Sequence, residues 1–118
     1  MGSDDLKIRT KNFALRIIRL VESLPNTQTA RVIGNQLLRC GTSVAANYRA
    51  SCRARSKADF ISKMGIVEEE TDESMFWIEM LVETNIIKEN LVADLLDEAE
   101  QPIKIFVSSI NTARGGNR

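Results

Sequence analysis

Residues 31–63 of the chain read RVIGNQLLRCGTSVAANYRASCRARSKADFISK. In the first part of this stretch, apolar or small side chains recur every three or four positions, which is the spacing of one helix face. Gly41 lies on this helix among small residues, so another helix could approach closely there, although glycine costs about 1 kcal/mol relative to alanine. Ser56, followed three positions later by Asp59, resembles a capping box. The stretch therefore predicts two long helices joined by a tight turn.

Extending the same period in both directions predicts four helices. They cover about 4–24, 29–53, 57–85 and 88–113. Pro25 ends the first helix, and Pro102 inside the fourth removes a backbone donor, which predicts a kink or break near Glu100. Short connections make sequential helices antiparallel neighbours. We therefore expect residues 1–118 to form one all-α domain, an up-down-up-down antiparallel four-helix bundle.

Large apolar side chains also fall outside the predicted core faces of the first and third helices. These residues are Ile8, Leu15, Ile18, Phe76, Trp77 and Met80. One alternative is that they are scattered surface residues, which are normal when they occur singly. Two such stripes on different helices favour contacts between subunits. The sequence therefore predicts a homo-oligomer with these side chains at the subunit interface.

Charge is distributed unevenly along the chain. Residues 1–63 carry a formal charge of +8 and residues 64–118 carry −8, although the total is zero. This asymmetry indicates either a nucleic-acid-binding surface or charge-matched packing between helices. The candidate phosphate-binding residues are Arg16, Arg19, Arg39, Arg49, Arg53, Arg55 and Lys57. The alternative is that these cations pair with the acids of the third and fourth helices.

Composition limits the possible chemistry. The chain contains no histidine, which excludes histidine-based metal sites and Ser-His or Cys-His nucleophile pairs. Cys40 and Cys52 fall on one predicted helix about 18 Å apart, beyond the reach of a disulfide. The acidic run 68–73 is typical of a solvated helix face. No apolar run is long enough for a membrane span, and no signal-peptide pattern opens the chain. We therefore expect a cytoplasmic protein that is not an enzyme and has no cofactor or metal.

Asn47 is a polar residue on the predicted core face of the second helix. A buried amide without hydrogen-bond partners would cost on the order of 2 kcal/mol. We therefore expect Asn47 to bond across the bundle to Thr71 or Ser74 and so to fix the register of the helices. The alternative is a contact with a ligand.

Several short motifs together resemble one known family. They are Leu37-Leu38-Arg39, Gly41-Thr42-Ser43, Ala46-Asn47, Ser56-Lys57-Ala58-Asp59-Phe60, Glu68-Glu69-Glu70-Thr71, Glu73 and Trp77. They are similar to the signature of the four-helix-bundle proteins encoded in intervening sequences of bacterial 23S ribosomal RNA genes, the S23 ribosomal protein family. The chain also resembles the accessory variability protein of diversity-generating retroelements. The resemblance runs from about Phe13 to Ala113, and Pro102 departs from the smooth fourth helix of the family.

The resemblance implies a four-helix bundle assembled into a homopentameric ring. For the retroelement relative it also implies a basic surface that engages nucleic acid and a reverse transcriptase as partner. Only Tyr48 lies near the basic residues as an aromatic platform, so contacts to the nucleic-acid backbone without base specificity are expected. The sequence therefore predicts a non-enzymatic homo-oligomer that binds RNA or DNA weakly. The alternative is a purely structural or protein-binding oligomer.

Overall fold

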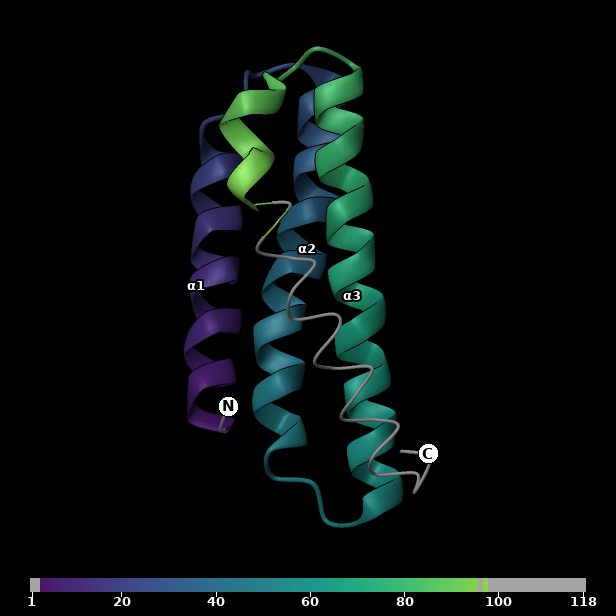
Figure 1. The fold of residues 1–118 in the computed structure, drawn as a ribbon. Coiled ribbons are helices and arrows are strands. Elements are labelled where there is room, and N and C mark those ends of the chain that lie inside the picture. Colours follow the sequence, from purple (N-terminus) through teal and green to yellow (C-terminus); the bar gives the residue numbers. More distant parts are fainter. Residues whose placement is uncertain (1–2, 96, 98–118) are drawn as a thin grey trace, which may run out of the picture.

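The computed structural model describes residues 3–95 and residue 97, and all the regular structure within them is helical. The described residues form three long helices, and Figure 1 shows that their axes are roughly aligned. They are α1 (Ser3–Glu22), α2 (Gln28–Ser51) and α3 (Lys57–Glu83), and a shorter helical segment follows at 89–95. The all-α class predicted from the sequence is confirmed. The remainder of the predicted fourth helix, with Pro102, lies outside the described residues.

Side-chain caps fix where α2 and α3 begin. The Thr27 hydroxyl accepts a hydrogen bond from the N–H of Ala30 at 3.2 Å. The Ser56 hydroxyl accepts one from the N–H of Asp59 at 3.0 Å. Both cap residues have extended backbone, as N-cap residues usually do. The hydroxyl group of each one satisfies an N–H group that the first helical turn leaves without a partner.

The C-terminal end of α3 is closed by backbone hydrogen bonds around Asn85. Asn85 has a φ of 62°, the left-handed conformation that asparagine tolerates better than most residues. The N–H of Ile86 donates to the Leu81 carbonyl at 3.0 Å, and the N–H of Asn85 donates to the Val82 carbonyl at 2.9 Å. These two bonds form a Schellman motif. The motif ends α3 and turns the chain so that Val92 and Leu95 pack into the core.

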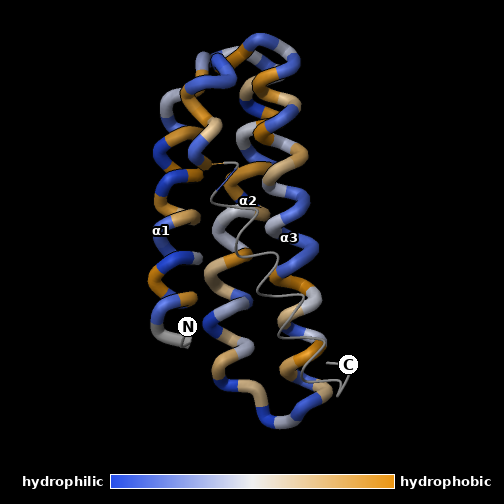
Figure 2. The backbone as a smooth tube through the Cα atoms, viewed as in Figure 1, coloured by the Kyte–Doolittle hydropathy of each residue, from blue (hydrophilic) through white to orange (hydrophobic). Residues whose placement is uncertain are grey.

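Helix α2 packs against both α1 and α3, and glycines allow α1 to approach it closely. A Cβ atom at Gly41 would lie only 2.7 Å from Cγ2 of Ile17, and one at Gly34 would lie 3.4 Å from Cγ1 of Val21. Since the later glycine faces the earlier residue of α1, the two helices run antiparallel. In Figure 2, hydrophobic and hydrophilic residues alternate along each helix, as the helical period requires.

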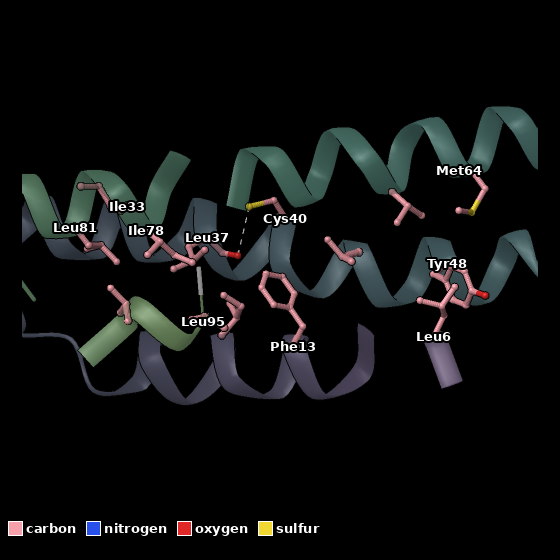
Figure 3. Close-up of a cluster of buried hydrophobic side chains, with 14 residues drawn as sticks. Leu6, Phe13, Ile33, Leu37, Cys40, Tyr48, Met64, Ile78, Leu81 and Leu95 are labelled. Carbon is pink, nitrogen blue, oxygen red and sulfur yellow. Dashed lines mark hydrogen bonds between the residues drawn. The ribbon is translucent and has the colours of Figure 1, made fainter. Parts of the chain in front are cut away.

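The core is a continuous cluster of side chains from all three helices and the 89–95 segment (Figure 3). Phe13, Ile17 and Leu37 are almost completely buried within it. Cys40 is also buried, and burial raises the pKa of its thiol. Cys40 and the exposed Cys52 are both free thiols. The cluster therefore holds α2 at the centre of the described helices.

The prediction that Asn47 bonds across the bundle is wrong in detail. Asn47 is half-buried, and its amide donates to the carbonyl and the hydroxyl of Ser43, one turn earlier on α2, at 3.0 and 2.8 Å. Thr71 and Ser74 are buried as expected, but each donates to the carbonyl four residues earlier on α3. Ser74 also donates to the sulfur of Cys40 at 3.2 Å. Acceptors on the same helix thus satisfy the side-chain donors of Asn47, Thr71 and Ser74, as is common for short polar side chains in helices.

Candidate nucleic-acid interface

A groove lined by basic residues runs between α1 and α2. Its volume is about 460 Å³, and it is lined by Lys7, Lys11, Thr42, Ala45, Ala46, Arg49 and Arg53. The two lysines lie one turn apart on α1. Arg49 lies in the last turn of α2, and Arg53 lies in the turn that follows the end of this helix. The other three lining residues are small, so space remains open along the groove. The groove therefore presents four cations around an uncharged centre.

A second hollow continues this surface at the turn between α2 and α3. It has a volume of about 650 Å³, and it is lined by Ala50, Arg53, Arg55, Asp59 and Lys63. Because Arg53 lines both hollows, they form one surface, which we call the cationic strip. The strip comprises the basic residues Lys7, Lys11, Arg49, Arg53, Arg55 and Lys63.

Among the described residues that line the strip, Asp59 is the acidic one, and its charge is matched locally. Its carboxylate accepts a hydrogen bond from the N–H of Arg55 at 3.2 Å and pairs with the Lys63 ammonium at 3.2 Å. The Arg55 N–H first and Lys63 second hold the pKa of Asp59 below its usual range. Asp59 therefore orders the turn and takes up the charge of Lys63, while Arg53 and Arg55 keep theirs.

Arg49, Arg53 and Arg55 are the arginines of the strip, and all three are exposed. Within residues 3–95 and 97, no hydrogen bond or ion pair of their guanidinium groups is found. A guanidinium group that has no carboxylate partner can donate two parallel hydrogen bonds to a phosphate. These three side chains are therefore the best placed to bind an anion.

Arg39, by contrast, pairs with acids of α3. Its Nη1 lies 3.1 Å from Oε2 of Glu70, and its Nη2 contacts Oε2 of Glu73. The hydrogen bond to Glu73 is the main cause of the raised pKa of Arg39. Arg39 thus follows the alternative interpretation of the charge asymmetry, in which helices pack with matched charges.

The structure brings together only some of the predicted cations. Arg49, Arg53 and Arg55 lie in the strip, whereas Arg16, Arg19, Arg39 and Lys57 line neither of its hollows. Sequence reasoning missed Lys7, Lys11 and Lys63, which do line the strip. For Lys7 and Lys11 a usable signal was their four-residue spacing, which repeats that of Arg49 and Arg53.

The predicted subunit-interface residues divide into two groups. Ile8, Leu15 and Phe76 are exposed in the single chain, to 60%, 38% and 49%. Ile18, Trp77 and Met80 are half-buried, and the last two pack against the core of their own chain. The ring of Phe76 meets that of Trp77 edge to face at 4.9 Å between centroids. An apolar surface thus extends from the core to Phe76.

Helical packing with a basic groove on one face defines this chain as a small all-α bundle protein. The chain belongs to the 23S rRNA-intervening sequence protein family, whose model matches residues 5–108. It is also similar to a crystal structure of a protein with unknown function from the S23 ribosomal protein family of Bacteroides thetaiotaomicron. The two chains are 34% identical with a TM-score of 0.87, and the match covers 94% of this chain and 99% of the other. No curated protein matches the chain.

The family resemblance noted from the motifs of α2 and α3 is therefore confirmed. Two further features concern the described part of the chain alone. None of its helices has the length and hydrophobicity needed to cross a membrane. No cluster of three or more cysteine or acidic side chains there is placed to hold a metal ion.

Proposed function

We propose that this protein is a non-enzymatic nucleic-acid-binding protein that holds the phosphate backbone of RNA or DNA in the cationic strip. The observation that supports it best is the groove between α1 and α2, where Lys7, Lys11, Arg49 and Arg53 surround an uncharged centre. Cations so arranged attract phosphates and release bound counterions, so the affinity falls as salt rises.

The groove also accounts for binding without sequence preference. Among the described residues, no aromatic side chain lines either hollow of the strip, so these residues offer bases no platform for stacking. Tyr48, which precedes Arg49 in the sequence, is buried in the core. Contacts to phosphates position a strand but do not read its sequence. The ligand class is therefore nucleic acid of any sequence, bound weakly.

On this proposal, the protein acts as a cytoplasmic homo-oligomer. Each chain is an up-down-up-down four-helix bundle, and the chains assemble into the pentameric ring that the family resemblance implied. Support comes from the apolar side chains of Ile8, Leu15 and Phe76, which a single chain leaves exposed. Light scattering coupled to size exclusion should give a mass several times that of the 13.2 kDa chain. A single-chain mass at micromolar concentration would contradict the assembly.

A structural or protein-binding oligomer without a nucleic-acid role is the second candidate. The contacts of Arg39 with Glu70 and Glu73 favour it, because they show that basic residues of α2 can be used for packing between helices. On this alternative, the strip would contribute nothing to binding a polyanion.

Charge reversal separates the two candidates. We expect Arg49→Glu/Arg53→Glu to abolish the binding of a fluorescent oligouridylate at low salt, measured by anisotropy, because the groove loses both guanidinium groups and gains two acids. The matched control is Arg31→Glu/Lys88→Glu, which makes the same charge change at exposed residues outside the strip. The control should bind almost as tightly as the wild type.

Two results would contradict the proposed function. One is a wild-type protein that does not bind the oligouridylate at low salt. The other is an equal loss of affinity in the two double variants, because net charge and not the strip would then be responsible.

A further inference from the structure

We propose that one nucleic-acid strand occupies both hollows of the cationic strip at once. The strand crosses the bundle from α1, over the end of α2, to the turn between α2 and α3, instead of following the groove along the helices. This inference rests on the proposed function and specifies the path of the bound strand. Four features of the described residues support it.

The first feature is the place where the two hollows meet. Arg53 lines both of them, and it lies in the turn just after the end of α2. Its side chain is exposed, and Arg55, two residues later, lines the second hollow only. A phosphate bound at Arg53 therefore lies where the hollows join. The phosphates before and after it on the same strand can then lie in one hollow and in the other.

The second feature is the direction in which positive charge continues along α2. The α2 side of the groove starts with three small, uncharged residues, and its cations, Arg49 and Arg53, follow in the last turn of the helix and just beyond it. Closer to the start of α2, Arg39 pairs with Glu70 and Glu73 and lines neither hollow. Positive charge on this side thus increases toward the turn, which favours a strand that leaves the groove there.

The third feature is the way Arg55 is held in the turn. Its backbone N–H donates a hydrogen bond to the Asp59 carboxylate at 3.2 Å, and the Lys63 ammonium pairs with the same carboxylate at 3.2 Å. This contact uses the backbone of Arg55 and leaves its guanidinium group to donate to a phosphate. A turn that is ordered before binding lowers the entropy cost of holding the strand. Arg55 is therefore suited to bind the strand at the far end of the strip.

The fourth feature is the length of the strip. Thr42 and Arg49 lie seven residues apart on α2, which is about 10 Å along the helix axis, and the second hollow extends the strip beyond Arg49. A single phosphate group cannot contact both ends of such a surface, whereas the linked phosphates of one strand can. Once one phosphate is bound, the next binds as part of the same molecule, which strengthens binding. The strip therefore fits a strand of several nucleotides.

Two single variants and their combination test this path. Lys11→Gln removes a cation that lines only the groove between α1 and α2, and Arg55→Gln removes one that lines only the second hollow. Both side chains are exposed, and Arg55 bonds to Asp59 through its backbone, so the fold should persist, which circular dichroism checks. Lys88→Gln, at an exposed residue outside the strip, is the matched control.

The measurement is the slope of the logarithm of the decauridylate association constant against the logarithm of salt concentration, which reports the number of neutralised phosphates. We expect each single variant to lose one phosphate contact, so that its slope becomes shallower by about 0.7, and the double variant to lose two, or about 1.4. Lys88→Gln should keep the wild-type slope.

A wild-type slope in Lys11→Gln or in Arg55→Gln would overturn the crossing path while the proposed function stands. If the slope falls only in the double variant, each hollow holds a strand of its own, which overturns the path as well. An equal loss in Lys88→Gln, or a wild-type protein that fails to bind, would refute the proposed function itself, and the crossing path with it.

Discussion

Replacing Phe13 by alanine is expected to lower the free energy of unfolding by about 3–5 kcal/mol. Phe13 is only 2% exposed, and in Figure 3 its ring points from α1 into the buried cluster. Truncation removes the apolar area of the ring and leaves a cavity that the surrounding helices fill only in part. The measurement is chemical denaturation followed by circular dichroism, with the protein concentration held fixed because assembly adds to stability.

Val32→Ala is the matched control for this loss. Val32 lies on α2 but is 56% exposed, so its truncation should change the free energy of unfolding by no more than about 0.5 kcal/mol. A loss at Val32 as large as that at Phe13 would mean that the core does not lie where α2 packs against α1 and α3.

Gly41→Val should produce the second large effect, by forcing α1 and α2 apart. A Cβ atom at this position would lie 2.7 and 2.9 Å from the two γ carbons of Ile17. Ile17 is fully buried, and its β-branched side chain has one strongly preferred helical rotamer, so it cannot move aside. Overpacking of this kind costs about 1–3 kcal/mol, and sometimes more, which thermal or chemical denaturation detects.

The control for the glycine is Gly65→Val on α3. Nothing lies within 4 Å of a Cβ atom built there, so this change should be close to neutral. A second test is to repeat Gly41→Val in an Ile17→Ala background, where the cost should be much smaller because the two closest atoms, the γ carbons of Ile17, are gone. Additive costs for the two substitutions would show that the close approach of Gly41 to Ile17 is not the cause.

The close approach of Gly41 to Ile17 also explains which parts of the candidate site could be predicted from the sequence. The period of apolar residues places Arg49 and Arg53 on one face of the helix predicted at 29–53, and their part in the strip could be predicted from that helix alone. The contribution of Lys7 and Lys11 depends on the register of α1 against α2, which the contact of Gly41 with Ile17 sets. A pattern of apolar positions within single helices carries no such register, so the two lysines were missed.

Helix boundaries and polar partners show the same division between local and long-range information. The caps at Thr27 and Ser56 are local, and α2 and α3 begin directly after them. Asn47 was expected to bond across the bundle because its position on the helix face was known, but an acceptor one turn earlier, at Ser43, satisfies it. The pairing of Arg39 with Glu70 depends on the rotation of α3 about its axis, which the sequence pattern leaves undetermined.

The most direct test of the central claim, that nucleic acid lies in the groove between α1 and α2, is lysine footprinting. The protein is acetylated with and without saturating oligouridylate, and the modified peptides are quantified by mass spectrometry. Bound nucleic acid should protect Lys7 and Lys11, which line the groove, and leave the exposed Lys88 as reactive as before. Equal reactivity of Lys7 and Lys11 in the free and bound protein would contradict the account.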